Sequence, residues 1–293
     1  MKRKMLIIDY FHDERDPLQH HIYNEMCELY ECTFSEKPNK KQIENSEYVY
    51  LGIYNHDVKN INDTIEQIKN KKVIIDQADD NCAIERYSNM NYDKLKYKVL
   101  LTRYNTKIFE DFFKNVNIDT IIFPWSININ MFPKNINKTR DLCFMCFIKE
   151  NRLKILNKLI DIRIRNSKLK FSCGLIFGSS YYKILNESKI SIIECYRKCI
   201  TQKYLESALS KNLIIGDLPI YPSEFKNYFE NNIISVNFDS EKDLEEKILK
   251  YLNDEEERNK IVSRLNSIVL DKFDSNKIVP KYMQKICNKL DSI

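Results

Sequence analysis

Glu206 is the residue of this sequence whose setting most favours ligand chemistry. It lies near the start of a short predicted helix, and the strand that follows ends in Gly216-Asp217. In a parallel α/β sheet such a helix begins at the carboxyl edge, where a carboxylate can accept hydrogen bonds from both hydroxyls of a ribose. The helix dipole alone also favours an acid near a helix start, so the residue by itself does not decide between the two interpretations.

Three basic residues can balance the charge of an anionic ligand. Lys203 precedes Glu206 by three positions, and Arg152 and Lys154 lie in the predicted helix 150–165. Cations that face a bound anion stabilise its negative charge. Lys203 can also be a solvated surface lysine, and Arg152 can instead pair with a local acid.

Polar residues follow two predicted strands of the N-terminal half. His12 and Asp13 come directly after the strand 4–10, and Asp79 comes after the strand 72–76. A histidine beside an acid can act as a general base. The acids around Asp79 can act as a base or can hold a divalent ion with two phosphates. Ordinary loop polarity accounts for His12 and Asp13 at least as well.

Strands and helices alternate along the sequence, which predicts parallel sheets covered by helices. In the first half, strands are expected at 4–10, 49–53, 72–76, 97–102 and 120–123, with helices at 17–30, 62–71 and 104–115. The polar residues 128–140 are expected to form a linker. In the second half, strands are expected at 141–147, 169–173, 189–193, 212–216 and 233–236, with helices at 150–165, 179–187, 201–210, 222–229, 241–252, 254–271 and 275–290.

This order predicts an α/β protein with two Rossmann-like doubly wound parallel-sheet domains facing a cleft. We expect an N-terminal domain at 1–130, a second domain at 131–274 and a C-terminal helix within 275–293. A sequence of 293 residues, of which 43% are hydrophobic, is long enough to build both cores.

Composition and motifs argue against several classes of protein. The 47 basic and 42 acidic residues give a net charge of only +5, and no run of like charges supports a nucleic-acid-binding tail. The weak positive charge is compatible with an anionic sugar nucleotide or with peripheral contact with an acidic membrane surface. No apolar stretch of about eighteen residues predicts a membrane span. No Walker, G-x-S-x-G or G-x-G-x-x-G motif predicts a kinase, a serine hydrolase or a dehydrogenase.

The nine cysteines are an odd number, scattered over a sequence in which we recognise no signal peptide, which predicts reduced thiols and a cytoplasmic location. Cys143-x-x-Cys146 has the spacing of a metal or redox motif. It lies in the apolar run 141–147, however, and strand alternation sends the two thiols to opposite faces. We therefore expect core cysteines there and no metal site.

An ordered series of motifs over residues 119–290 resembles the C-terminal half of a GT-B glycosyltransferase of the group-1 type. The stretch from Tyr182 to Ile190 is similar to the family's Y-x-x-L-L-x-x-S-K-I. Lys203-x-x-Glu206-x-Ala208 is similar to R-x-x-E-x-x-A-x-G, and Arg152 opens a segment similar to R-x-x-I-L. The order of the pieces makes the resemblance moderately specific.

Three positions depart from the family pattern. Lys198 stands eight residues before Glu206, where a second acid is expected, and Phe147 or Ile148 replaces a glycine after the strand 141–147. The turn after the acidic helix has Lys211-Asn212 where glycine is usual. Because asparagine tolerates positive φ, we expect that turn to survive.

The resemblance implies transfer of a sugar from a nucleotide-sugar donor, a UDP- or GDP-sugar, to an acceptor hydroxyl on a glycan, lipid or protein. It implies that the second domain binds the donor, through Glu206, Lys203, Arg152, Lys154, Ser207 and Tyr182. It implies that the first domain binds the acceptor, with His12, Asp13 or Asp79 as the base of an inverting enzyme. It further implies no bound metal, no cofactor beyond the donor, and a last helix that crosses back to the first domain. The alternatives are a non-catalytic sugar- or nucleotide-binding scaffold and, third, a nucleic-acid-binding protein.

Overall fold

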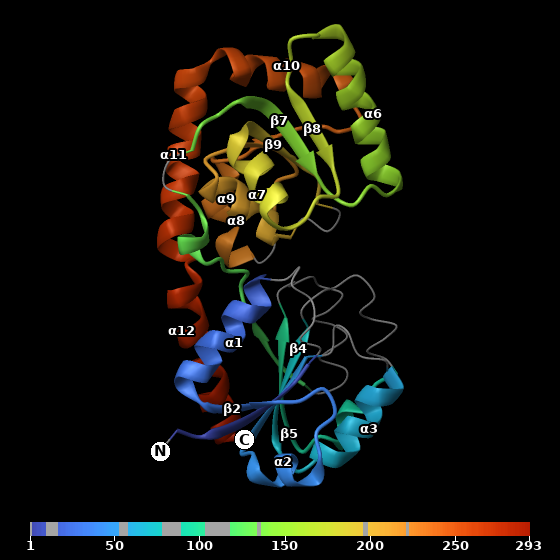
Figure 1. Ribbon diagram of the computed structural model, residues 1–293, viewed down its shortest axis with the longest axis vertical. Coiled ribbons are helices and arrows are strands. Elements are labelled where there is room, and N and C mark those ends of the chain that lie inside the picture. The colour runs from blue at the N-terminus through green and yellow to red at the C-terminus, as the bar shows by residue number, and fades with distance from the viewer. Residues whose placement is uncertain are drawn as a thin grey trace. The chain divides into compact units, whose positions relative to one another are not determined.

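The computed structural model describes residues 2–9, 17–52, 58–77, 89–102, 118–133, 136–195, 199–220 and 223–293. The chain forms two compact units, one made of Met1–Trp125 together with Ser275–Ile293 and the other of Ser126–Asp274. Figure 1 shows the ribbon with its elements numbered along the chain. The first unit is discontinuous in sequence, because the last helix of the chain belongs to it.

The first unit contains a six-stranded, fully parallel sheet with the order β2-β1-β3-β4-β5-β6. The strands are β1 (Lys4–Ile8), β2 (Glu31–Phe34), β3 (Tyr48–Gly52), β4 (Lys72–Gln77), β5 (Tyr97–Thr102) and β6 (Asp119–Ile122). The chain leaves β1 toward β2 on one side and then enters β3 on the other side. The direction of winding therefore reverses between β1 and β3.

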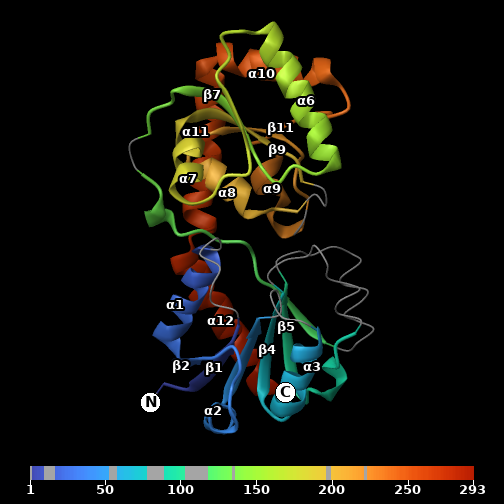
Figure 2. The ribbon, with the colours of Figure 1, turned by 45° about the vertical axis from the view of Figure 1, so that its right-hand side comes forward.

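Helices cover both faces of this sheet (Figures 1 and 2). α1 (Pro17–Leu29) and α12 (Ser275–Ser292) lie side by side on one face. α2 (Lys40–Asn45) and α3 (Val58–Ile68) lie on the other face, together with a 3-10 turn at Tyr92–Lys94. The core under α2 and α3 is largely aliphatic, so burial of apolar surface holds these layers together.

Asp291 fastens the end of α12 to the amino edge of the first sheet. Its carboxylate accepts hydrogen bonds from Lys72 Nζ at 2.7 Å, from Arg3 at 2.5 Å and from the Tyr48 hydroxyl at 2.6 Å. Partial burial raises the pKa of Asp291, but the hydrogen bonds from Lys72, Tyr48 and Arg3 outweigh that effect and hold the pKa well below its usual range. The ionised carboxylate is thus the state that the folded unit favours.

The second unit contains a five-stranded parallel sheet with the order β11-β10-β9-β7-β8. The strands are β7 (Arg140–Met145), β8 (Phe171–Gly174), β9 (Ser188–Ile193), β10 (Leu213–Gly216) and β11 (Ile234–Ser235). The chain passes from β7 to β8 at the edge and then returns to β9 on the other side of β7. The switch point of this sheet lies between β7 and β9.

α6 (Glu150–Arg165) and α10 (Glu241–Asn253) pack on one face of the second sheet, and α7 (Gly178–Glu187) and α8 (Gln202–Leu209) pack on the other (Figures 1 and 2). α11 (Glu255–Lys272) contacts α8 and β10. The remaining elements are short: α9 (Lys226–Glu230) and 3-10 turns at Ile129–Met131 and Ser223–Phe225.

Alternate side chains along β7, and at the residue that follows it, pack into two different cores. Phe144 and Cys146 belong to the core under α6, whereas Cys143 and Met145 belong to the core under α7. Cys143 and Cys146 therefore lie on opposite faces, which confirms the prediction from strand alternation, and both are buried free thiols.

The two parallel-sheet units confirm the predicted fold class. Sequence analysis missed β2 and α2, and the predicted helix 104–115 lies outside the described residues. β2 is only four residues long and mostly exposed, so no apolar alternation marks it. Across the part of the chain that the structure describes, none of the helices combines the length and apolar character needed to cross a bilayer.

Replacing Asp291 tests whether its carboxylate stabilises the first unit. We expect Asp291→Asn to lower the free energy of unfolding by about 1 to 2 kcal/mol near pH 7, because the carboxylate is shared by two cations and a phenol. Because the pKa of Asp291 is lower in the folded protein than in the unfolded protein, its carboxylate stabilises the fold above the unfolded pKa of roughly 4. The loss of unfolding free energy in the variant therefore shrinks as the pH falls below that value toward the folded pKa. Urea denaturation near pH 7 and near pH 3 measures the difference.

Glu246→Gln is the matched control, because the Lys242–Glu246 pair is strongly exposed, with side chains 85% and 65% accessible. Such a pair contributes less than about 0.5 kcal/mol. Equal losses in the two variants would contradict a special role for Asp291.

Gly216 marks a close approach between β10 and β9. A Cβ at this position would overlap the backbone carbonyl of Ile193. We expect Gly216→Ala to lower the free energy of unfolding by about 1 to 3 kcal/mol, because the strands must separate to admit the methyl group. Ser235→Ala, at the exposed position paired with Gly216, should change it by less than about 0.5 kcal/mol. Chemical denaturation that finds both variants equally stable would exclude the overlap.

Candidate functional site

Charged side chains gather at the carboxyl edge of the second sheet, at its switch point. β7 and β9 are hydrogen-bonded neighbours although β8 lies between them in sequence. Segments that leave such a pair of strands diverge, and ligands of α/β proteins bind in the crevice that this opens. Arg152, Glu194, Lys203 and Glu206 all come from the segments that follow these two strands.

Arg152 lies in the first turn of α6 and is held by an acid. Its Nε donates to Glu194 Oε2 at 2.7 Å, and its Nη1 donates to the carbonyl of Phe147 at 3.2 Å. The two side chains are only 26% and 11% exposed. The pairing fixes the guanidinium at the carboxyl edge. Sequence analysis missed Glu194, although it is the first residue after a predicted strand that ends at this edge.

Lys203 lies in the first turn of α8 and donates from Nζ to the carbonyl of Met145, the last residue of β7, at 2.9 Å. Burial lowers the pKa of Lys203 and the charge of Arg152 acts in the same direction, whereas Glu206 and Glu194 raise it. A cation in a first turn also faces the positive end of the helix dipole. A bound anion would relieve these unfavourable interactions.

Glu206 lies in the second turn of α8, so the dipole at the helix start does not explain it. It is 6% exposed, and its carboxylate accepts hydrogen bonds from the Tyr181 hydroxyl at 2.5 Å and from the Tyr182 hydroxyl at 3.3 Å. The ring of Tyr182 packs edge-on against Tyr181 and Phe132, with centroids 5.2 and 5.6 Å away. Sequence analysis named Tyr182 but missed Tyr181, whose only signal is its place beside Tyr182.

Asp217, the first residue after β10, hydrogen-bonds to the segments that carry the candidate site. Its carboxylate accepts a hydrogen bond from the backbone N–H of Cys195 at 2.8 Å, and its carbonyl accepts one from the Tyr204 hydroxyl at 2.8 Å. These bonds join the segments that follow β9 and β10 to α8. Asp217 therefore helps to fix the helix that carries Lys203 and Glu206.

The remaining predicted site residues are either near Glu206, exposed to solvent or outside the described residues. Ser207 is buried beside Glu206 in α8, and Lys154 is exposed on α6. The structure thus brings Arg152, Lys203, Glu206 and Tyr182 to one edge. His12, Asp13, Asp79 and Lys198 lie outside the described residues.

The turn after α8 forms without glycine, but its left-handed residue is Lys211, with φ of 54°, rather than Asn212 as expected. Asn212 is buried. Its amide donates to the carbonyl of Leu185 at 2.9 Å and to Ser191 Oγ at 2.8 Å, and its oxygen accepts from Lys138. Asn212 therefore stabilises the turn through the buried hydrogen bonds of its side chain and not by adopting a left-handed backbone conformation.

Two buried acids mark the carboxyl edge of the first sheet. Asp9 follows β1 and accepts a hydrogen bond from the Tyr23 hydroxyl, and Asp76 in β4 accepts one from the Tyr50 hydroxyl. A Cβ on Gly52 would overlap the Asp9 carboxylate, so glycine at the end of β3 makes room for it. Within the described ranges, no three His, Cys, Asp or Glu side chains are grouped to hold a metal ion.

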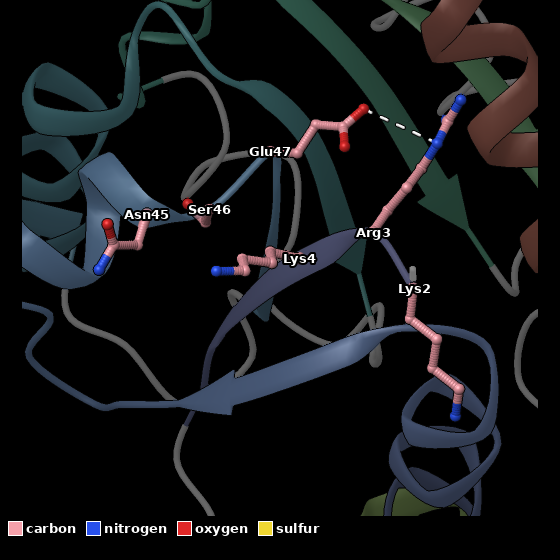
Figure 3. Close-up of a pocket in the computed structure, with 6 residues that line it drawn as sticks. All are labelled: Lys2, Arg3, Lys4, Asn45, Ser46 and Glu47. Atoms are coloured by element: carbon pink, nitrogen blue, oxygen red, sulfur yellow. Dashed lines mark ion pairs between the residues drawn. The ribbon is translucent and has the colours of Figure 1, made fainter.

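A shallow basic depression lies at the amino edge of the first sheet. Figure 3 shows its lining: Lys2, Arg3, Lys4, Asn45, Ser46 and Glu47. Its three cations point in different directions, and Arg3 pairs with Glu47 (Figure 3). Lys2 Nζ donates to the carbonyl of Cys27 at 3.1 Å, and Arg3 also pairs with Asp291. The cations do not converge on one anion, and ligands of parallel sheets bind at the opposite edge.

Comparison with known proteins agrees with the geometry of the second unit. Residues 166–284, less than half of the chain, match the family described as glycosyl transferase-like. No curated protein sequence matches the chain.

Several solved structures are similar in fold. Sucrose-phosphate synthase from Thermosynechococcus elongatus is 8% identical, with a TM-score of 0.69 and 100% of both chains covered. Anabaena HepE in complex with UDP is 9% identical, with a TM-score of 0.64 and 100% of both chains covered. The pneumococcal O-GlcNAc transferase GtfA, solved with UDP and GlcNAc, is 14% identical, with a TM-score of 0.59.

The alignment with GtfA covers 86% of this chain but only 59% of GtfA. At these identities the similarity establishes the fold. The chain therefore has the two-domain Rossmann-like GT-B fold, and over residues 166–284 it resembles the glycosyl transferase-like family.

Proposed function

We propose that this protein transfers a glycosyl group from a nucleoside-diphosphate sugar to an acceptor hydroxyl. The observation that carries the proposal is the placement of Arg152 and Lys203 near Glu206 at the switch point of the second sheet. Two adjacent cations, each in the first turn of a helix, favour an anion, and a carboxylate suits the paired hydroxyls of a ribose. A nucleoside diphosphate carries both groups in one molecule.

The donor residues have separate roles in this proposal. Glu206 accepts hydrogen bonds from the ribose, and Arg152 and Lys203 stabilise the diphosphate as it leaves. Tyr182 and Ser207 line the same helix pair, and Lys154 lies farther out on α6. Because these cations supply positive charge, the leaving group needs no metal ion.

A UDP-sugar is the donor that we favour, and a GDP-sugar is the second candidate. GtfA and HepE, which are similar in fold, were both solved with UDP. These structures support the choice of nucleotide, and the family match over residues 166–284 supports the reaction class.

The first unit binds the acceptor in this proposal, whether that is a glycan, a lipid or a protein. Its sheet ends in the buried acids Asp9 and Asp76, and His12, Asp13 and Asp79 follow the same strands in sequence. In an inverting reaction, one such base takes the proton from the acceptor hydroxyl while that oxygen attacks the anomeric carbon. The bond to the nucleoside diphosphate breaks in the same step.

Removing either cation tests the diphosphate contact. We expect Arg152→Met and Lys203→Met each to weaken UDP binding by about tenfold or more, because hydrogen bonds to charged groups contribute roughly 1.5 to 3 kcal/mol. Isothermal titration calorimetry gives the affinities. Lys154→Met is the matched comparison on α6, and a loss of less than about twofold would place Lys154 outside the diphosphate contact. Unchanged affinity in both the Arg152 and Lys203 variants would contradict the proposed donor site.

Turnover separates an enzyme from a binding scaffold. We expect the wild type to release UDP slowly from a UDP-sugar by transfer to water, and Glu206→Ala to abolish this release because the donor is no longer held. Coupled detection of UDP measures the rate, with UDP- and GDP-sugars compared. Tight donor binding by the wild type without any turnover would indicate the scaffold.

A further inference from the structure

We propose that Tyr181 is a positioning residue that holds the Glu206 carboxylate for the ribose, and that the Tyr182 hydroxyl gives way when the ribose binds. The inference rests on the proposed function, because it concerns the same donor site. It is carried by the unequal hydrogen bonds that the two tyrosines make to the two oxygens of one carboxylate.

Tyr181 makes the shorter of these bonds. Its hydroxyl lies 2.5 Å from Glu206 Oε2, whereas the Tyr182 hydroxyl lies 3.3 Å from Oε1. A hydrogen bond from a hydroxyl to a carboxylate is strongest near the distance that Tyr181 makes, and it is weak at the longer distance that Tyr182 makes. Tyr181 therefore orients the carboxylate, and Tyr182 only contacts it.

The surroundings of Tyr181 keep it a donor. Burial raises the pKa of Tyr181 well above its ordinary value, and the charge of Glu206 acts in the same direction. The phenol thus retains its proton across the physiological range. Because Glu206 is 6% exposed, its carboxylate also needs a fixed donor to offset the loss of water.

Tyr182 is held less closely at the carboxylate than Tyr181 is. Its ring is half-buried and packs edge-on against Phe132, which precedes β7. A ribose hydroxyl carries one O–H donor, as the phenol does, and it can replace Tyr182 at Oε1 without leaving the carboxylate unsatisfied. Tyr181 keeps Oε2 in both states.

The test compares UDP with 2′,3′-dideoxy-UDP, which lacks both ribose hydroxyls. In the wild type we expect UDP to bind at least about tenfold more tightly than the dideoxy analogue, because the carboxylate loses its ligand partners. In Tyr181→Phe we expect UDP binding to weaken by about tenfold while the affinity for the analogue changes by less than twofold. In Tyr182→Phe we expect UDP binding to hold within about threefold or to tighten.

Each outcome of this comparison decides something. If Tyr181→Phe weakens both ligands equally, Tyr181 has only a structural role and the proposal is overturned. If Tyr182→Phe loses more UDP affinity than Tyr181→Phe, the assignment of the two tyrosines is reversed and the proposal also fails. Calorimetry supplies the affinities, and the affinity for the analogue reports in the same experiment whether each variant is folded.

Failure of the proposed function gives a different result. If the wild type binds UDP and the dideoxy analogue equally well, Glu206 makes no ribose contact, whatever the tyrosine variants do. If it binds neither of them, nor GDP, the donor site itself is wrong. Selective binding by the wild type with an unaffected Tyr181→Phe variant overturns only the role of Tyr181.

Discussion

The parallel pairing of β7 with β9 is the constraint on which the candidate site depends. Because the chain visits β8 before it returns to β9, the segments after β7 and β9 diverge and leave the end of β7 uncovered. Lys203 occupies that end by donating to the carbonyl of Met145, and Arg152 is held against Glu194 beyond the end of β9. The order of the strands, and not any local motif, therefore brings residues fifty positions apart in sequence to one edge.

The surroundings of Lys203 are unfavourable for its charge, because burial outweighs the help of Glu206 and Glu194. Lys203 meets burial, a neighbouring guanidinium and the positive end of a helix, and each of these disfavours its charge. The first unit shows the opposite arrangement, because Asp291 is satisfied by its own three partners.

The sheets, most helices and the candidate cations could be predicted because they depend on apolar periodicity and on residue type. β2 could not be predicted, since a short exposed strand lacks that periodicity. Glu194 and Tyr181 were missed because their importance comes from partners that are distant in sequence. Lys211 could not be expected in a left-handed conformation, because propensity favours Asn212 there, yet the buried amide of Asn212 is needed elsewhere.

The return of α12 to the first unit also has a consequence for how the protein is made. Arg3 and Asp291 are partners across a separation of 288 residues, so β1 and β3 emerge from the ribosome long before the helix that covers their sheet. The second unit is continuous in sequence and can fold in the meantime. The part of the first sheet that α12 covers therefore stays without that helix until the last residues of the unit are synthesised.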